Sequence, residues 1–505
     1  MRRPTDKRDN AFPSENHAMN RRLRGCCQLA FSFVLLVNLR ALLADEKQPH
    51  AALAEQATAA MHKATDYMKT HVAVHGGYVY DVTVDLKHRR GEGVATPTEV
   101  WVQPPGTPTV GIAFIRAYEA TGDKIHLDAA VECANALLHG QLESGCWTDR
   151  VDFDPSGKNA GRYRHGKGKK SGRNYSTLDD DKSQAALRLL IETDRALKFQ
   201  DVAIHEAVEF GLNALRKAQF SNGGFPQGWD KPVEQLPVVK ASIPNYDWRT
   251  EGRFKNYWDY ETLNDGLAGT VTKTLQLAYE VYSDERYRQA MLKFGDFLIL
   301  AQLPEPQPAW AQQYNHQLQP IWARKFEPPA IAGRESEDAI ETLLYLTEVT
   351  GEKRFLEPIP RAIAWLKRSQ LPDGQIARFY ELNTNTPLYF VKDTYELTYD
   401  DSNLPTHYGF KSRSRVSRLE ERYQVLQEGE QPKLSGRSLK SLKKDAEEIL
   451  VQQDSAGRWI TDKNGKAVSN SDGKEQDKLF LQSELFSEHL SRLAEFVAAV
   501  RTTKP

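Results

Sequence analysis

Several features are scarce in this sequence, and their scarcity excludes classes of protein. There are four cysteines among 505 residues, and no zinc-type spacing links them. Cys26 and Cys27 lie near the N-terminus. Cys133 and Cys146 lie further along, and in an exported protein they could form a disulfide or remain two buried thiols. A cysteine-based zinc site is therefore excluded.

The sequence also lacks an excess of either charge sign. Lys and Arg number 67 against 68 Asp and Glu, so the chain as a whole carries no polyanion-binding signal. It contains no nucleic-acid-binding motif, and we expect no nucleic-acid partner. With 505 residues, of which 40% are hydrophobic, the chain is long enough for one large domain or two smaller ones.

Long apolar runs are missing except near the N-terminus. An arginine-rich stretch, residues 21–24, precedes the apolar run 29–37, and polar sequence begins at Asp45. The run is short for a membrane span and is followed closely by Asn38 and Arg40. We predict a signal peptide over residues 1–44 and an exported protein, periplasmic or secreted. An uncleaved membrane anchor is the alternative, and residues 45–505 are expected to form one domain.

What the sequence does contain is a repeat. A helix with a glycine- and aromatic-rich loop after it recurs at Gly122–Trp147, Asp201–Gln227, Ser283–Gln313 and Gly351–Tyr380. Each repeat follows another amphipathic helix, expected over Pro108–Thr121, Asp181–Ala196, Asn264–Tyr282 and Glu335–Thr350. The spacing of ~60–85 residues is typical of a helical-repeat array.

A single helix pair cannot bury its apolar face, so the pairs must stack side by side. About six pairs would close into an all-α (α/α) toroid, with the loops gathered at one rim. An open solenoid is the structural alternative. Two segments break the pattern and are expected to be loops: residues 157–174, rich in Gly, Lys and Arg, and residues 389–413. The basic loop could steer a polyanion or be simply a solvated segment.

Two acidic strings precede predicted helices. Asp179, Asp180 and Asp181 are consecutive, and three adjacent carboxylates repel one another unless a cation binds there. Asp265 follows Asn264 at the next inner helix start. Either string could simply cap its helix. In a closed array the two helix starts face the same rim, and carboxylate oxygens from two loops suit Ca²⁺.

Two further strings mix aromatic and charged residues. The segment 308–329 includes Trp310, Tyr314, Arg324 and Glu327, a mixture that fits sugar stacking and carboxylate pairing, or else packing on the neighbouring helices. The segment 376–385 carries Arg-Phe-Tyr-Glu, in which the arginine and glutamate could form an ordinary ion pair.

Together these strings resemble the family 10 pectate lyases, and the resemblance is strongest over residues 175–390. The matching strings are Thr-Leu-Asp-Asp, Leu-Asn-Asp, Pro-Ala-Trp-Ala-Gln-Gln-Tyr, Ala-Arg-Lys-Phe-Glu-Pro and Ala-Arg-Phe-Tyr-Glu. The resemblance implies an (α/α) toroid that cleaves polygalacturonate with calcium. It departs from the family at Ile376, where Trp is usual, and at Thr386, where Arg is usual.

Carried over to this chain, the resemblance implies roles for individual residues. Arg378 would be the catalytic base, and Arg324 would hold a substrate carboxylate. Calcium would be held by Asp265 together with one of Asp179, Asp180 and Asp181. The remaining residues expected to contact substrate are Lys182, Trp310, Tyr314, Glu327 and Tyr380.

This chemistry explains why the site needs both acids and cations. Elimination removes the proton α to a carboxylate, and the developing negative charge must be neutralised by Ca²⁺ and arginines. We therefore expect a pectate lyase that acts as a monomer on an acidic polysaccharide at high pH. Three alternatives remain: a toroidal glycoside hydrolase using two carboxylates, a non-catalytic polysaccharide-binding homologue, and a terpenoid cyclase-like toroid.

Overall fold

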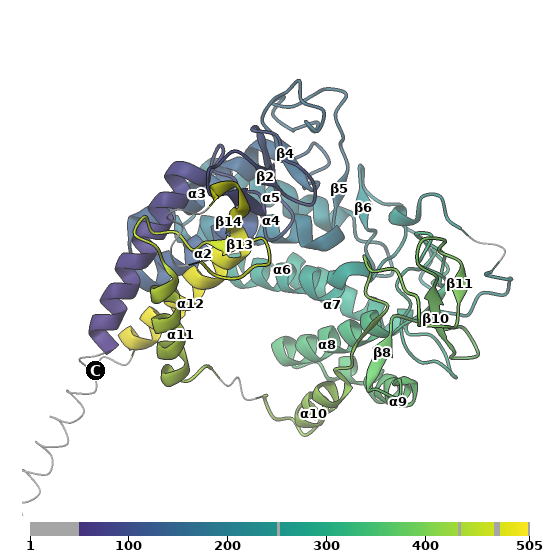
Figure 1. Ribbon diagram of the computed structural model, residues 1–505. Coiled ribbons are helices and arrows are strands. Elements are labelled where there is room, and N and C mark those ends of the chain that lie inside the picture. Colours follow the sequence, from purple (N-terminus) through teal and green to yellow (C-terminus); the bar gives the residue numbers. More distant parts are fainter. Residues whose placement is uncertain (1–49, 250–252, 433–435, 469–474, 503–505) are drawn as a thin grey trace, which may run out of the picture.

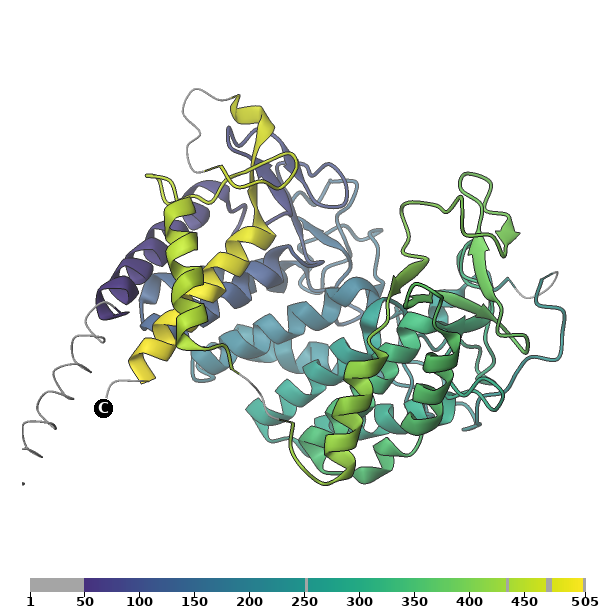
Figure 2. The same ribbon diagram turned by 60° about the horizontal axis from the view of Figure 1, so that its bottom comes forward.

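The computed structural model describes residues 50–249, 253–432, 436–468 and 475–502. The predicted signal peptide, residues 1–44, lies outside the described part. Figure 1 shows helix pairs that follow one another around a curve, and Figure 2 shows the short strands and long loops gathered at one end of these helices.

The helices of the described residues form an inner and an outer layer. The inner helices, in their order around the curve, are α12 (Ser483–Thr502), α2 (Thr107–Thr121), α4 (Lys182–Ala196), α6 (Leu267–Tyr282), α8 (Gly333–Thr350) and α10 (Val416–Gln427). The outer helices, in the same order, are α11 (Leu439–Gln452), the helix of residues 50–67, α3 (Lys124–Gly140), α5 (Val202–Lys217), α7 (Glu285–Ala301) and α9 (Ile359–Ser369).

Neighbouring inner helices pack on one another from α12 to α10, and each also packs on an outer helix. The six pairs form an (α/α) toroid, which confirms the predicted fold class. The pair at the end of the chain sits beside the pair at its beginning, since α12 packs on α2. In both views α10 and α11 lie apart, so the curve is open on that side (Figures 1 and 2).

The turns inside the pairs follow from short capping signals. Gly122, Ser283 and Gly351 end the inner helices α2, α6 and α8 in the left-handed backbone region. Aspartates then cap the outer helices: Asp123 accepts from the backbone N–H of Ile125, and Asp201 and Asp284 act in the same way on α5 and α7.

A glutamine after four of the outer helices ties each pair to the next. The Gln219 side chain donates to the carbonyl oxygens of Gly223 in its own turn and Ala290 on the next outer helix, each at 2.9 Å. Gln141, Gln302 and Gln453 make the same pair of bonds at their own turns. Because these amides are buried or half-buried, the bonds fix the angle between successive pairs.

Fourteen short strands of the described residues lie at the ends of the helices: β1 (Asp81–Thr83), β2 (Arg89–Arg90), β3 (Glu99–Trp101), β4 (Arg150–Asp152), β5 (Ser176–Thr177), β6 (Gly228–Trp229), β7 (Ala330–Ala332), β8 (Gln375–Ala377), β9 (Phe379–Glu381), β10 (Pro387–Phe390), β11 (Leu397–Thr398), β12 (Lys411–Arg413), β13 (Thr461–Asp462) and β14 (Leu479–Gln482). They pair antiparallel as β13-β14-β1-β2, β11-β10-β9-β7, β12-β8, β3-β4 and β5-β6. The β1–β14 pair joins the first helix pair to the last.

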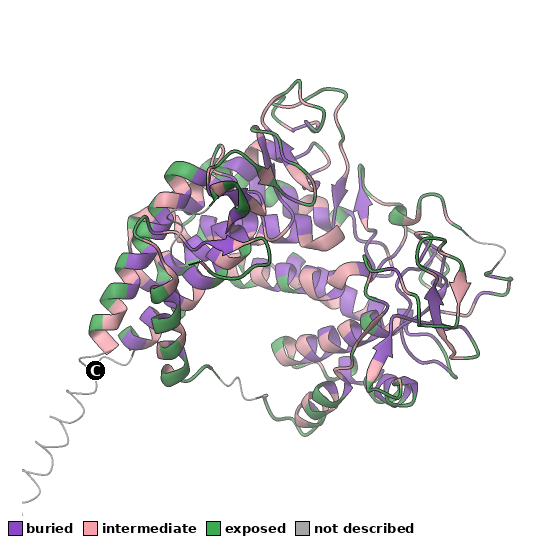
Figure 3. Cartoon of the chain, viewed as in Figure 1, coloured by how far each residue is buried: buried purple, intermediate pink, exposed green. Residues whose placement is uncertain are grey.

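Burial follows the layers, since the buried positions in Figure 3 line the contacts between helices and continue into the rim loops. Both described cysteines, Cys133 and Cys146, are free and fully buried. They belong to the core, which was one of the two expectations for them. Across the described ranges, no helix has the length and apolar character that crossing a membrane requires.

Candidate active site

The inner helices α4 and α6 begin with the same backbone pattern. Leu178 and Leu263 each donate a backbone N–H to a glutamine carbonyl oxygen, that of Gln227 at 2.8 Å and that of Gln312 at 2.9 Å. In both strings the residue after the leucine also donates its N–H to the threonine hydroxyl two positions before it, at 3.1 Å. The two acidic strings are therefore equivalent parts of successive repeats.

Each string then turns sharply through left-handed backbone. Asp180 and Asp265 occupy the same repeat position, with φ of 47° and 52°. Such backbone is costly for a residue with a side chain, and aspartate tolerates it better than most residues. The turn aims both carboxylates toward the same point of the rim.

Asp179, Asp180 and Asp265 form the acidic cluster. One carboxylate oxygen from each lies within 4.8 Å of the others. An ion bound about 2.3–2.6 Å from each oxygen would span such a group, as Ca²⁺ does in its oxygen sites. The residues present therefore fit a hard divalent cation, which three crowded carboxylates favour.

Lys182 already faces this cluster from the first turn of α4. Its ammonium lies 2.5 Å from a carboxylate oxygen of Asp179 and 3.5 Å from one of Asp180. It is nearly buried, at 5% exposure. Lys182 was predicted to contact substrate, but the structure places its charge against the acidic cluster instead.

The charges of the cluster are not balanced by Lys182 alone. Burial, with Asp180 and Asp179 adding to it, raises the pKa of Asp265 to about 7. Burial and then Asp179 also raise the pKa of Asp180. For Asp179, burial works in the upward direction, but Lys182, Gln227 and Asp265 together outweigh it and the pKa is lowered. The cluster therefore retains surplus negative charge at neutral and alkaline pH.

Asp181, the third aspartate of the string, does not join the cluster. Its carboxylate lies 2.5 Å from the guanidinium of Arg188. Both residues line a cavity between α2, α4 and α12. The sequence left open which of the three consecutive aspartates lies beside Asp265. In the structure these are Asp179 and Asp180.

Arg324 lies beside the cluster, held by Glu327. The guanidinium makes a two-point contact with the Glu327 carboxylate, at 2.8 Å and 2.5 Å, while 36% of the Arg324 side chain remains exposed. Burial alone would lower the pKa of Arg324, but Glu327 raises it, so this side chain stays charged. It can therefore offer its remaining donors to an anion beside the acidic cluster.

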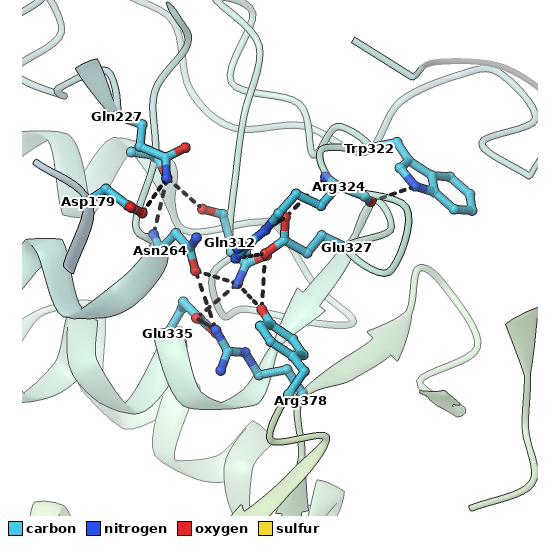
Figure 4. A network of polar contacts seen from close by, with 11 residues as sticks. Asp179, Gln227, Asn264, Gln312, Trp322, Arg324, Glu327, Glu335 and Arg378 are labelled. Atoms are coloured by element: carbon cyan, nitrogen blue, oxygen red, sulfur yellow. Dashed lines mark hydrogen bonds and ion pairs between the residues drawn. The ribbon is translucent and has the colours of Figure 1, made fainter. Parts of the chain in front are cut away.

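Arg378 comes from the segment between β8 and β9 and reaches the same rim. Its Nη2 lies 2.6 Å from Glu335 Oε1 and 3.4 Å from the side-chain oxygen of Asn264, the neighbour of Asp265 (Figure 4). Its Nε is buried with no hydrogen-bond partner among the described residues. The predicted base and the second acidic string are therefore brought together, as the resemblance implies.

To act as a base, Arg378 must be neutral, and crowding by Ca²⁺ and other cations would favour that form. Burial does act in that direction, but Glu335, Tyr408 and Asp265 outweigh it and raise the pKa of Arg378. Burial raises the pKa of Glu335 in turn. In the protein alone, Arg378 is a charged guanidinium paired with a buried carboxylate.

The three aromatic residues predicted to contact substrate are part of the core. Trp310, Tyr314 and Tyr380 have 0%, 0% and 1% exposure. Trp310 donates to the Leu298 carbonyl oxygen, and the two tyrosine hydroxyls donate to carbonyl oxygens at the ends of α7 and α9. These side chains shape the repeat, so the prediction that they meet substrate is wrong.

Sequence reasoning missed two tyrosines of the site. The ring of Tyr408 faces both arginines: its centroid lies 4.6 Å from the guanidinium carbon of Arg378 and 5.6 Å from that of Arg324. The Tyr408 hydroxyl donates to Glu327 at 3.1 Å. Tyr257 is close enough to Arg324, Glu327, Asp179 and Asp265 for their charges to act on its pKa, which burial raises. Tyr408 comes from an irregular loop and Tyr257 begins the short 3-10 turn Tyr257–Asp259, so no period marks either position.

Figure 4 shows the resulting network, which several loops of the rim supply. Gln312 donates to Asn264 at 2.8 Å and to Glu335 at 3.2 Å, and so bridges the second acidic string to the partner of Arg378. Gln227 holds Asp179 in the same way at 2.6 Å. Together these contacts join five carboxylates and three cations. The carboxylates are those of Asp179, Asp180, Asp265, Glu327 and Glu335, and the cations are Lys182, Arg324 and Arg378. When all eight are ionised, two negative charges are left.

Comparison with known proteins gives one family. Residues 141–411, more than half of the chain, match the family described as pectic acid lyase. No curated protein sequence matches the chain.

Two solved structures illustrate the structural likeness. A mutant of the family 10 polysaccharide lyase from Cellvibrio cellulosa, in complex with trigalacturonic acid, is 19% identical and covers 63% of this chain and 98% of its own, with a TM-score of 0.44. The cellobiose 2-epimerase from Spirochaeta thermophila is 13% identical and covers 90% of this chain and 98% of its own, with a TM-score of 0.45.

Proposed function

The chain belongs to the pectic acid lyase family and is a polysaccharide lyase, and from this premise we propose that it cleaves pectate by calcium-assisted β-elimination. The observation that carries the proposal is the acidic cluster of Asp179, Asp180 and Asp265 beside Arg324 and Arg378. The same group of residues explains the need for a metal, the choice of substrate and the position of the base.

A site with more carboxylates than cations repels an acidic polymer. The two surplus negative charges are what one divalent cation would neutralise, and its binding would leave Arg324 and Arg378 free to attract a uronate. Asp179, Asp180 and Asp265 would hold the ion, and calcium suits their hard oxygens. When bound, calcium withdraws charge from the substrate carboxylate and so acidifies the adjacent C–H.

We propose that Arg324 orients the substrate. Its guanidinium is fixed by Glu327 but remains partly exposed. A planar guanidinium with free donors binds a carboxylate in a defined orientation. We assign Arg324 to the carboxylate of the sugar that reacts or of its neighbour.

We assign to Arg378 the role of accepting the C5 proton. It is nearly buried, and its Nη2 lies 3.4 Å from Asn264, next to the proposed metal ligand Asp265. Because Glu335 raises its pKa, the neutral form needed for a base is scarce at neutral pH. The rate of elimination should therefore increase with pH well into the alkaline range.

Four wider expectations belong to this proposal. The predicted signal peptide and the family together support export from the cell. Residues 45–505 are proposed to act as one domain, since the first and last helix pairs pack together. The acidic polysaccharide is the partner that we propose, and the enzyme is expected to act as a monomer.

An absorbance assay tests the proposal. Elimination leaves a conjugated double bond, so polygalacturonate treated at alkaline pH should gain ultraviolet absorbance with calcium and none with a chelator. New reducing ends without absorbance would instead indicate hydrolysis. Binding of the polymer with no cleavage of any kind would indicate a non-catalytic homologue.

A further inference from the structure

The acidic cluster has a neighbour from outside the matched family region. Gln103 lies just before α2 and Glu92 lies in the loop between β2 and β3, both ahead of residue 141 where the family match begins. The Gln103 amide nitrogen donates to Asp180 Oδ2 at 3.2 Å and to Glu92 Oε1 at 2.9 Å. The first helix pair therefore reaches into the cluster.

Gln103 occupies the repeat position of Asp179. Val102 donates its backbone N–H to the Asp149 carbonyl oxygen at 2.9 Å, as Leu178 and Leu263 donate to Gln227 and Gln312. The residue that follows is Gln103 ahead of α2, Asp179 ahead of α4 and Asn264 ahead of α6. Three successive inner helix starts thus carry an oxygen-bearing side chain at the same repeat position.

Within the described part of the chain, the side-chain oxygen of Gln103 has no partner. The side chain is buried, at 6% exposure, and Oε1 has no hydrogen bond among the described residues. A buried acceptor without a partner is unfavourable by about 1–3 kcal/mol and calls for an explanation. The two ends of an amide have nearly the same shape, so a half turn about its last bond would exchange the donor that faces Asp180 for this acceptor.

Glu92 adds charge at the same point. Its carboxylate is exposed, accepts from Gln103, and contributes to the raised pKa values of Asp180 and Lys182. Its distance from the cluster is therefore short enough for electrostatic coupling. Carboxylate and amide oxygens are the side-chain ligands that calcium takes in proteins.

We propose that Gln103 and Glu92 complete the cation site, with Gln103 as an amide-oxygen ligand and Glu92 as a further carboxylate. The proposal rests on the proposed function, because it takes Asp179, Asp180 and Asp265 as the core of that site. It makes the first helix pair a working part of the active site rather than an appendage to residues 141–411.

Calcium titration by calorimetry, on the full-length protein without substrate, tests the proposal. Gln103→Leu keeps the size but removes both polar atoms, and should weaken calcium binding about 10-fold or more. Gln103→Glu keeps an oxygen at the same place and should bind calcium at least as tightly as the unaltered protein. Glu92→Gln should weaken binding several-fold, and Gln317→Leu, an exposed matched control, should leave it unchanged.

The outcomes separate this proposal from the one on which it rests. If the unaltered protein binds calcium and Gln103→Leu and Glu92→Gln bind it equally well, the added ligands are wrong and the three aspartates suffice. If Gln103→Glu binds more weakly than Gln103→Leu, the amide acts only as a donor to Asp180, and the ligand role is wrong. If the unaltered protein binds no calcium, the proposed cation site itself fails. Thermal melting of each variant shows whether it is folded, and Gln103→Glu and Glu92→Gln still decide the matter if the leucine variant is not.

Discussion

At the scale of single residues, Asp265 is a carboxylate whose ionisation is opposed first by burial and then by Asp180 and Asp179. Its pKa is about 7 in the folded protein, against about 3.9 in an unfolded chain. A raised carboxyl pKa means that the folded state loses stability as pH rises from about 4 to about 7, and that the loss is complete above 7. A cation bound at the cluster would reverse this loss.

The stability that the folded protein loses when Asp265 ionises predicts how the variant Asp265→Asn behaves. In a chelator at pH 8 the variant should melt about 2 °C higher or more, because the neutral amide removes the repulsion. The gain should shrink toward zero near pH 4.5, where the aspartate is protonated in the folded protein. Calcium should raise the melting temperature of the unaltered protein but not of the variant. Scanning calorimetry at both pH values measures this, and a less stable variant at pH 8 would contradict the electrostatic reading.

Arg378→Ala should lower kcat by about 10²–10⁴, because it removes the proposed proton acceptor. Arg413→Ala, which removes an exposed arginine of β12, serves as the matched control and should retain full activity. Initial rates on polygalacturonate measure both variants. Unchanged turnover in Arg378→Ala would remove this residue from the role of base.

The pH profile depends on the partner of Arg378. Glu335 is the largest cause that raises the pKa of Arg378, so Glu335→Gln should lower that pKa and increase the neutral fraction at a given pH. The alkaline limb of the kcat profile should therefore move to lower pH, whatever happens to the maximal rate. A limb that stays in place, or moves to higher pH, would mean that Arg378 does not control it.

The sequence predicted the charged residues of this site better than its aromatic residues. Asp179, Asp180, Asp265, Arg324 and Arg378 were found from short strings, and the fold brings all of them to one rim. Aromatic residues in the same strings misled, because a motif records packing as well as chemistry: Trp310 and its neighbours fill the repeat core. Tyr408 could not be found, since nothing in the sequence fixes how a long loop folds back.

At the scale of elements, the repeat explains why the site lies where it does. Gln227, Gln312 and Arg378 each offer their carbonyl oxygen to the start of an inner helix, to Leu178, Leu263 and Gly333 respectively. They therefore occupy one repeat position, at which two units carry a structural glutamine and the third carries the proposed base. A helical period predicted the pairs from sequence, but not which units would become catalytic.

The glutamines that tie the pairs together predict a stability effect. Gln219→Ala would leave the carbonyl oxygens of Gly223 and Ala290 without their shared donor. The expected cost is about 1–3 kcal/mol, since both acceptors are buried or half-buried. Thermal or denaturant unfolding measures it, with the exposed Gln317→Ala as control. Equal stability of the two variants would show that the ties between pairs contribute little.

At the scale of the whole molecule, positive and negative charges nearly cancel, but they are not evenly spread over the surface. The chain has a formal net charge of −1, yet exposed cations gather in the loop of residues 157–174 near the rim, among them Lys167, Lys169 and Lys170. Such a patch can attract a polyanion although the molecule as a whole does not. Composition alone could not show this, since only the fold places the loop on the same side as the acidic cluster.

Replacing Lys167, Lys169 and Lys170 together by Gln should raise KM for polygalacturonate about 3-fold or more at low ionic strength and leave kcat unchanged. The difference should vanish at high salt, where exposed charges are screened. The matched control replaces Lys440, Lys443 and Lys444 on α11, far from the site (Figure 1). Equal KM values for the two triple variants would make the loop merely a solvated segment.

In the proposed complex, one uronate sugar meets the acidic cluster through a cation and Arg378 through its C5 hydrogen. A crystal structure of the Arg378→Ala protein with calcium and a galacturonate oligomer would show this arrangement. We predict an ion bound by Asp179, Asp180 and Asp265 that also binds a sugar carboxylate, with Arg324 on a carboxylate and C5 facing the space left by the Arg378 side chain. An ion bound elsewhere, or a sugar whose C5 faces away from residue 378, would contradict the account.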